Sequence, residues 1–419
     1  MLHCSPLPLL ILTISIFFPH IFSISHSSNF TSPIGINYGQ VADNLPSPGS
    51  VLPLLHSLCA NRVKLYDTDP RVLSAFANTG IEFVVGLPDD LVPHLARDPS
   101  AASSWVRSSI LPHMPGTKIT AITIGNEVLS GNDMSLIRSL VPAMESVQSA
   151  LTSSGLDSKI MVTTAHSLAV LETSFPPSGA AFKKELIPYL SQLLCFLQKT
   201  GSPFLINAYP YFAYKADPKN MNLNYVLFEP NAGVVDSSSG LRYNNMLHAQ
   251  VDAVRTAIRK VMPSNAKIEI RVSETGWPSK GDDDEAGATP ENARRYNGNL
   301  MQIVSQNKGT PAAPDEPLQV YVFALFNENL KPGPASERHY GLFQPDGTPA
   351  YNLGVVLGSG VGPTGGKGNS GNATAESPVS QIGEVSSAGY YTISGTKILR
   401  PFCLEKLCAL AVTLLLVWH

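Results

Sequence analysis

The chain has 419 residues, of which 43% are hydrophobic and 15% charged, and its formal net charge at pH 7 is −3. A near-neutral charge argues against a nucleic-acid-binding protein, which usually carries a basic face, and the high apolar content excludes disorder over most of the length. The length admits one large domain or two ordinary ones, since barrels of about 250–300 residues form a single unit.

The chain opens with an apolar segment, over residues 7–18. This run has the length of the hydrophobic region of a secretory signal peptide and is short for a membrane span. Prolines at positions 6, 8 and 19 disfavour a buried helix. We therefore predict a cleaved signal over residues 1–28, hence a secreted protein.

Eight short runs rich in β-branched and aromatic residues follow, as is typical of strands buried on both faces. They are Ile34–Tyr38, Arg62–Tyr66, Ile81–Leu87, Ala121–Ile124, Ile160–Thr164, Phe204–Ala208, Ile268–Ser273 and Val320–Phe326. Helical patterns between them include Val51–Leu58, Ala102–Leu111, Leu136–Leu151, Leu186–Gln198 and Met246–Val261. Eight alternations of strand and helix predict an α/β fold, a single (β/α)8 TIM barrel over residues 29–357. A doubly wound open sheet is the alternative, but no Gly-rich phosphate loop follows the first strand.

Two cysteines, Cys59 and Cys195, fall within the predicted barrel. They belong to the first helix and to the helix before the sixth strand, which lie on roughly opposite sides of a barrel. A disulfide needs Cα atoms about 4.4–6.8 Å apart, so we expect two buried free thiols instead.

Beyond the barrel the composition changes. Residues 358–394 are rich in Gly, Ser and Thr and are predicted to be a linker. Small residues at 394–396, a polar spacer and a terminal apolar run from 407 to 418 follow the pattern of a GPI-attachment signal, which we place at 395–419. The alternative is a plain tail on a secreted protein. Two N-x-[ST] sequons, at Asn29 and Asn372, flank the domain and predict a glycoprotein.

Two carboxylates stand where predicted strands end. Glu127 follows the fourth strand and Glu274 the seventh. Active sites of such barrels form at the carboxyl ends of the strands, and a carboxylate is costly to bury unless it is paired or useful. Two carboxylates about 5–5.5 Å apart, one protonated and one ionised, serve retaining glycosidases. The amide of Asn126 is placed to hydrogen-bond a sugar 2-hydroxyl.

Aromatic residues are frequent at the same strand ends, and aromatic rings pack against the apolar faces of sugars. They are Tyr38, Tyr66, Tyr209, Tyr211, Phe212, Tyr214, Trp277 and Phe326. A single glutamate after a strand is more often part of a salt bridge, and a single aromatic is usually core. The paired glutamates at matching barrel positions favour a glycosidase. No His, Cys or Asp cluster has metal-ligand spacing, so no metal or cofactor is expected. The acidic run 282–285 is interpreted as a solvated loop.

At these residues the sequence resembles the plant glucan endo-1,3-β-glucosidases of glycoside hydrolase family 17. The matching stretches are GINYGQ at 35–40, TIGNEV at 123–128, NAYPYFAY at 207–214, RVSETGWPSKGD at 271–282 and FALFNENLKPGPASERHYGLF at 323–343. The resemblance covers about residues 34 to 355, in family order. It implies that Glu127 is the general acid/base and Glu274 the nucleophile of a retaining endo-hydrolysis of β-1,3-glucan, either callose or microbial wall glucan.

The resemblance also implies supporting roles for further residues. Glu328, Lys331 and Glu337 would orient the two glutamates and tune their charge. Tyr209 would lie close to the nucleophile, and Phe212 and Phe326 would line the glucan cleft. Tyr38, Tyr66 and Asn126 complete the set of expected substrate-binding residues.

Several alternatives stay open. A non-hydrolytic callose-binding surface protein would keep the barrel without turnover, although the intact pair of glutamates favours the enzyme. A β-1,3-glucan transglycosylase shares the covalent intermediate and differs in its acceptor. Mixed-linkage glucan is a possible substrate, and the sequence does not decide between defence, development and callose turnover. The expected partner is β-1,3-glucan, with no nucleic acid, membrane contact only through the lipid anchor, and a monomeric chain.

Overall fold

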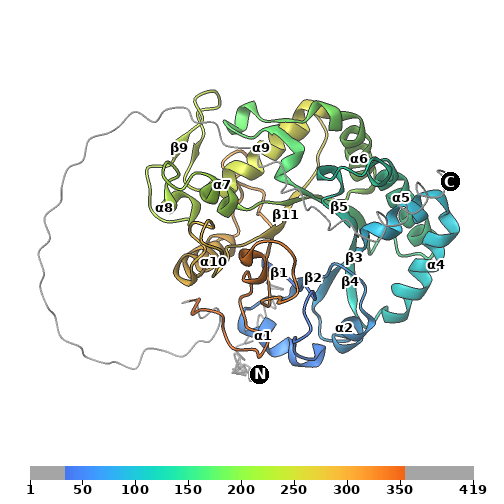
Figure 1. The fold of residues 1–419 in the computed structure, drawn as a ribbon. Helices are drawn as coiled ribbons and strands as arrows, with labels where there is room; N and C mark the ends of the chain where they lie inside the picture. The colour runs from blue at the N-terminus through green and yellow to red at the C-terminus, as the bar shows by residue number, and fades with distance from the viewer. Residues whose placement is uncertain (1–33, 354–419) are drawn as a thin grey trace, which may run out of the picture. The chain divides into compact units, whose positions relative to one another are not determined.

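The computed structural model describes residues 34–353, and the signal, linker and anchor predicted at 1–28, 358–394 and 395–419 lie outside them. Eight parallel strands close into a barrel in the order β1-β12-β11-β8-β5-β4-β3-β2 (Figure 1). Their bounds are β1 Ile34–Asn37, β2 Arg62–Lys64, β3 Glu82–Leu87, β4 Lys118–Asn126, β5 Met161–Ser167, β8 Phe204–Asn207, β11 Ile270–Thr275 and β12 Val320–Val322. The predicted (β/α)8 fold and all eight predicted strands are confirmed.

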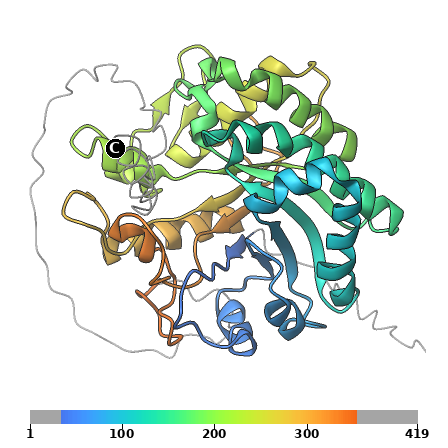
Figure 2. The ribbon, with the colours of Figure 1, turned by 45° about the vertical axis from the view of Figure 1, so that its right-hand side comes forward.

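Helices surround the strands on the outside (Figures 1 and 2). They are α1 Leu52–Ser57, α2 Pro70–Ala75, α3 Val92–Arg97, α4 Pro99–Ser109, α5 Met134–Ser153, α6 Ile187–Thr200, α7 Pro210–Ala216, α8 Leu223–Val226, α9 Met246–Val261 and α10 Pro290–Ser305. The five predicted helices are confirmed within a few residues as α1, α4, α5, α6 and α9, whereas α2, α3, α7, α8 and α10 were not among them. No helix within residues 34–353 is long and apolar enough to cross a membrane.

Two small antiparallel sheets lie within the loops that follow β5 and β8. One pairs β6 Leu171–Thr173 with β7 Ala181–Phe182, and the other pairs β9 Val234–Val235 with β10 Arg242–Tyr243. These excursions lengthen the connections at the carboxyl ends of the barrel strands, which is the end where loops build active sites in this fold.

The strands are apolar because almost every residue in them is buried. All four residues of β1 are buried, and so are five of the six in β3. Packing is close enough that a Cβ atom at Gly35 would overlap the ring of Tyr321. The buried polar side chains of the strands are an exception to this rule, and several of them gather at the carboxyl ends of β1, β2, β8 and β11. They are Asn37, Lys64, Asn207, Ser273 and Glu274.

The prediction of two buried thiols was wrong, because both Cys59 and Cys195 are exposed. Cys59 lies in the turn after α1 with a φ of 51°, and Cys195 lies on the side of α6 opposite its buried leucines. Within the described residues no disulfide joins the two, as expected from their positions on the barrel.

Candidate active site

Glu127 and Glu274 both lie at the carboxyl end of the barrel. Glu127 directly follows β4 in a left-handed conformation with φ 56°, and its amide donates to the carbonyl of Ala165 over 2.9 Å. Glu274 is part of β11, where the register shifts just before it, so that its Cα pairs with that of Asn207 on β8. A left-handed backbone at a residue other than glycine, as at Glu127, is strained, and such strain is often found at functional sites.

Glu274 is 6% exposed and accepts three hydrogen bonds. Its Oε1 accepts from Lys64 Nζ at 2.9 Å and from the Tyr66 hydroxyl at 2.7 Å, and its Oε2 accepts from the Tyr209 hydroxyl at 3.0 Å. Burial by itself would raise the pKa of Glu274, but the charge and hydrogen bond of Lys64 and the hydrogen bond of Tyr66 outweigh it. The pKa therefore lies below its usual value, and Glu274 is ionised at neutral pH.

Glu127 has the opposite environment. Burial and the negative charge of Glu274 raise its pKa to about 7, and the hydrogen bond from Asn207 and the charge of Lys64 oppose that rise. The Asn207 amide donates to Glu127 Oε1 at 2.8 Å. Two carboxyl groups whose environments push their pKa values apart are suited to act as an acid and a nucleophile.

A chain of hydrogen bonds orients the Asn207 side chain. Its Oδ1 accepts from Ser273 Oγ at 2.6 Å, and the carbonyl of Ser273 accepts from Asn37 Nδ2 at 3.0 Å. Sequence reasoning did not single out Lys64, Asn207 or Ser273. The available signal was a charged residue inside an apolar strand, in the RVKLY stretch at 62–66.

Asn126 is half-buried beside Glu127. Its backbone amide donates to Asp89 Oδ1 at 2.9 Å, whereas its side-chain Oδ1 is buried without a hydrogen-bond partner in the described part of the chain. A buried, unsatisfied amide oxygen is costly, so this group is available for a donor such as a sugar hydroxyl.

Glu328, Lys331 and Glu337 lie in the segment that follows β12. Glu328 is buried and accepts from the Val41 amide at 2.8 Å, and burial raises its pKa. Lys331 Nζ lies 3.5 Å from Glu337 Oε2 and 4.2 Å from the centre of the Phe323 ring. The charge of Lys331 helps to lower the pKa of Glu274, and the charge of Glu337 helps to raise that of Glu127.

The expected substrate-binding aromatics divide into two groups. Tyr66, Tyr209 and Phe212 are partly exposed, and the rings of Tyr209 and Phe212 lie 5.4 Å apart. Tyr38 and Phe326 are each only 2% exposed and pack edge-on against one another at 5.9 Å. The structure thus places Phe326 in the core, where it offers a substrate little surface.

The acidic run 282–285 is not uniformly solvated, because Glu285 is 5% exposed. It accepts from Lys215 Nζ at 2.7 Å, from the amide and hydroxyl of Ser336 at 2.8 and 2.6 Å, and from the Asp282 amide at 3.0 Å. These bonds fasten the loop after β11 to α7 and to the segment that carries Glu337. The prediction of a solvated loop holds for its neighbours and is wrong for Glu285.

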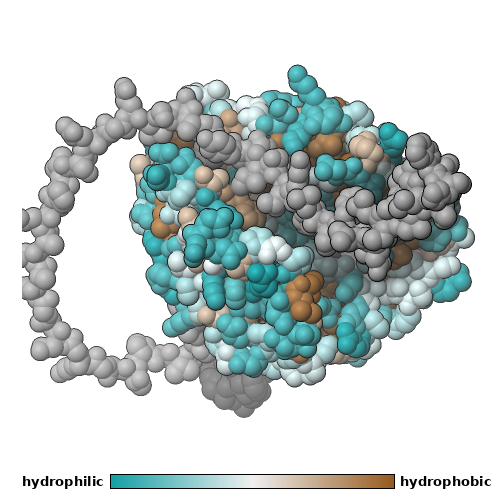
Figure 3. Space-filling view, viewed as in Figure 1, coloured by the Kyte–Doolittle hydropathy of each residue, from teal (hydrophilic) through white to brown (hydrophobic). Residues whose placement is uncertain are grey.

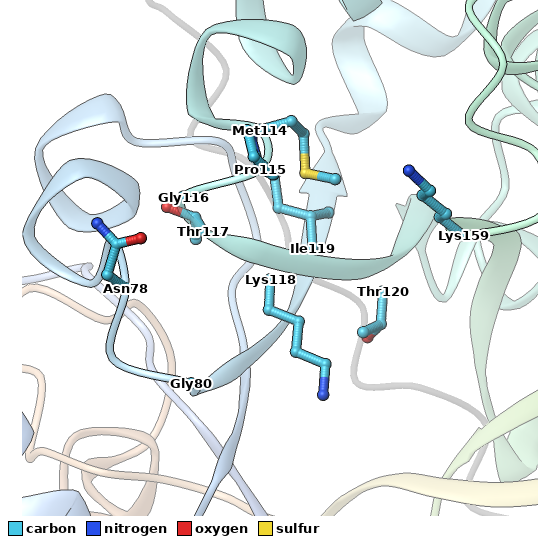
Figure 4. A pocket seen from close by; sticks show the side chains of 10 residues that line it. All are labelled: Asn78, Gly80, Met114, Pro115, Gly116, Thr117, Lys118, Ile119, Thr120 and Lys159. Atoms are coloured by element: carbon cyan, nitrogen blue, oxygen red, sulfur yellow. The ribbon is translucent and has the colours of Figure 1, made fainter.

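A pocket at the other end of the barrel does not contribute to this site. It is lined by residues near the start of β3 and β4, among them Asn78, Lys118 and Lys159 (Figure 4). Because β4 begins at Lys118 and ends at Asn126, the pocket and Glu127 are at opposite ends of this strand. The residues that line it include no carboxylate.

A (β/α)8 barrel with one glutamate of raised pKa and one of lowered pKa at its carboxyl end is the arrangement of a glycoside hydrolase. The chain belongs to the glycosyl hydrolases family 17, whose family model matches residues 34–355. This confirms the resemblance seen in the sequence. Among residues 34–353, no group of three or more His, Cys, Asp or Glu side chains is arranged to hold a metal ion.

Named relatives are similar over most of the chain. Glucan endo-1,3-beta-glucosidase 11 of Arabidopsis thaliana is 56% identical over 329 residues, which are 78% of this chain and 76% of that protein. The structure of CJP38, a β-1,3-glucanase and allergen of Cryptomeria japonica pollen, superposes with a TM-score of 0.72 at 43% identity and covers 76% of this chain and 98% of its own. The structure of one of two plant β-glucan endohydrolases with distinct substrate specificities superposes with a TM-score of 0.70 at 37% identity. It covers 76% of this chain and 99% of its own.

Proposed function

We propose that this protein is a retaining endo-1,3-β-glucanase that hydrolyses internal linkages of β-1,3-glucan, either callose or microbial wall glucan. The observation that carries the proposal is the unequal pair of glutamates: Glu127 with a pKa of about 7 and Glu274 with a lowered one. The substrate class is supported by relatives at 56% and 43% identity that are named as a glucan endo-1,3-beta-glucosidase and a β-1,3-glucanase.

In the first step the Glu274 carboxylate attacks the anomeric carbon of the glucosyl unit in the site. The bond to the leaving glucan oxygen breaks with its electron pair, and Glu127 donates its proton to that oxygen. Lys64 and Tyr66 hold Oε1 of Glu274 and Tyr209 holds Oε2, so the carboxyl group is oriented before substrate arrives.

In the second step Glu127, now a carboxylate, removes a proton from water, and the water oxygen attacks the same carbon. The ester bond to Glu274 breaks and its carboxylate is restored, so configuration at the anomeric carbon is retained over two displacements. Residues Tyr66, Tyr209 and Phe212 are proposed to contact the sugar, with Asn126 at the 2-hydroxyl and Glu328, Lys331 and Glu337 setting the local charge.

The proposed enzyme is secreted and held at the outer face of the plasma membrane or in the cell wall by a GPI anchor. The sequence patterns at 1–28 and 395–419 support this localisation. If phosphatidylinositol-specific phospholipase C released none of the protein from membranes and mass spectrometry found Trp418 intact, the anchor would be withdrawn.

We propose a monomer. Five large hydrophobic side chains of the described residues are exposed: Val41, Leu111, Met134, Val235 and Leu330. Val41 and Leu330 are neighbours and the others belong to separate elements. On the face shown in Figure 3, hydrophobic groups are scattered among hydrophilic ones. Scattered single apolar side chains are normal on monomeric proteins.

Product analysis on a soluble β-1,3-glucan tests the function. The wild-type protein is expected to release short oligosaccharides, Glu274→Ala is expected to release none, and Glu291→Ala, an exposed glutamate on α10, serves as the control. Longer products from the wild type would instead support a transglycosylase. Binding without cleavage would support a non-hydrolytic glucan-binding protein, and cleavage by Glu274→Ala at the wild-type rate would remove Glu274 as the nucleophile.

A further inference from the structure

Lys64 is a buried cation at the site, and the sequence did not single it out. It ends β2, is 1% exposed, and lies with Nζ 2.9 Å from Glu274 Oε1 and 4.1 Å from the centre of the Tyr66 ring. Among the described residues, Glu274 is its ion-pair partner. A buried ammonium group without a counter-charge is strongly destabilising. A reaction step that removes the negative charge of Glu274 would therefore be costly unless another negative charge replaced it.

The reaction proposed above changes the charge of both glutamates in one step, and the inference rests on that proposal. When Glu274 forms its bond to the anomeric carbon it becomes a neutral ester. When Glu127 gives its proton to the leaving oxygen it becomes a carboxylate. One negative charge is lost beside Lys64 while another appears on Glu127, so the site holds a single carboxylate of the pair before and after the step.

Asn207 connects the two glutamates, and the charge of Lys64 acts on both carboxyl groups. Asn207 donates to Glu127 Oε1 at 2.8 Å, and its Cα pairs in register with that of Glu274, whose Oε1 contacts Lys64. We propose that Lys64 is a positioning residue that serves both glutamates in turn: its ammonium group keeps Glu274 ionised before attack and stabilises Glu127 as a carboxylate while Glu274 is esterified.

The other groups around the pair do not fill this role. Glu274 faces Tyr66 from the segment after β2, Tyr209 from the segment after β8 and the charge of Lys331 after β12. Lys331 is already paired with Glu337 and lies over the Phe323 ring, so its charge is shared.

Glu127 faces Asn207, which is neutral, and the charges of Glu274 and Glu337, which oppose its ionisation. The same charge of Lys64 lowers the pKa of both Glu127 and Glu274. Lys64 is thus the cation whose counter-charge is removed by esterification.

The test compares pH profiles of kcat/KM on laminarin for the full chain and for Lys64→Gln, which keeps a hydrogen-bond donor but has no charge. The loss of an opposite charge as close as the 2.9 Å between Lys64 Nζ and Glu274 Oε1 raises the pKa of a carboxyl group by about one unit or more. We therefore expect the acid limb, set by Glu274, to move to higher pH by about one unit or more, and the basic limb, set by Glu127, to move in the same direction. A defect in folding or packing alone would lower kcat/KM at every pH and would not move the two limbs in the same direction.

Two control variants accompany it. Lys64→Arg keeps the charge and is expected to leave both limbs close to those of the wild type. Lys215→Gln removes a different partly buried lysine, one that pairs with Glu285 away from the two glutamates, and is expected to leave the limbs unchanged. Thermal unfolding of each variant reports its folding, and Lys64→Met, whose apolar side chain suits burial, replaces Lys64→Gln if that protein does not fold.

A second readout separates the two chemical steps. A 2,4-dinitrophenyl β-laminaribioside has a leaving group that needs no protonation, so the first step depends on Glu274 alone, whereas release of the sugar needs Glu127 as a base. We expect Lys64→Gln to show a burst of dinitrophenolate followed by turnover that is slowed about tenfold or more. The reason is that Glu127 cannot act as a general base while it stays protonated. Limbs and burst equal to those of the wild type would overturn the role of Lys64. A wild-type protein that cleaves neither substrate would instead overturn the proposed function.

Discussion

The amide of Asn207 donates to Oε1 of Glu127 over 2.8 Å, and its orientation is fixed because its own Oδ1 accepts from Ser273 Oγ. Ser273 is the residue directly before Glu274 on β11. Glu127 and Glu274 are therefore connected through the neutral side chains of Asn207 and Ser273, with Asn207 on β8, one of the two strands that separate β4 from β11. This explains how two carboxyl groups, one directly after β4 and one on β11, keep a fixed relation although the two strands are not neighbours.

The first prediction concerns the basic limb of the pH profile. Because the pKa of Glu127 is about 7, wild-type kcat/KM on laminarin is expected to fall as the pH rises through about 7. Asn207→Ala removes a hydrogen bond that favours the ionised form, so the pKa of Glu127 rises and the limb moves to higher pH, by about one unit for a charged hydrogen bond. Asn220→Ala, at an exposed amide, is the control. A limb that stayed in place would show that Asn207 does not act on Glu127.

The second prediction concerns stability. The folded state holds its proton on Glu127 up to a pKa of about 7, whereas an unfolded glutamate loses it near 4.5. Between these values the folded state binds more protons, so this group destabilises the fold increasingly as the pH rises through that window and fully above it.

Glu127→Gln removes that charge and keeps an acceptor for Asn207. We expect the variant to be more stable than the wild type by about 2–3 kcal/mol at pH 8 and equal to it at pH 4, below both pKa values. Urea denaturation at the two pH values measures the difference. A gain of equal size at both would point to packing and not to the charge.

The barrel was predictable because parallel strands buried on both faces produce runs of apolar residues that end in turns. The glutamates were predictable because a carboxylate at the end of such a run is conspicuous. Lys64 was missed because its neighbours in sequence do not show that its side chain lies beside Glu274, 210 residues away. Helix α10 was missed because most of its residues are polar, and its buried face becomes apparent only against the barrel.

The third prediction concerns Glu285, whose burial depends on contacts with Lys215 and Ser336 that lie far from it in sequence. Glu285→Ala leaves the buried amide and hydroxyl of Ser336 without their acceptor, and each buried donor left unsatisfied costs about 1–3 kcal/mol. We expect the free energy of unfolding to fall by about 3 kcal/mol in urea denaturation. The control is Asp284→Ala, at the exposed residue next to Glu285, which should change the free energy of unfolding by less than about 0.5 kcal/mol. Equal effects of the two would mean that this loop is not fastened through Glu285.

The last prediction separates the two groups of aromatic residues. Phe212 is partly exposed beside Tyr209, so Phe212→Ala should weaken glucan binding equally in the ground and transition states. We expect KM on laminarin to rise about two- to tenfold with kcat unchanged, from a loss of about 0.5–1.5 kcal/mol. Phe326→Ala empties a buried site against Tyr38 and should cost about 3–5 kcal/mol of stability in urea denaturation. If Phe326→Ala raised KM at unchanged stability, this ring would line the cleft after all, and its burial in the free protein would have to open when glucan binds.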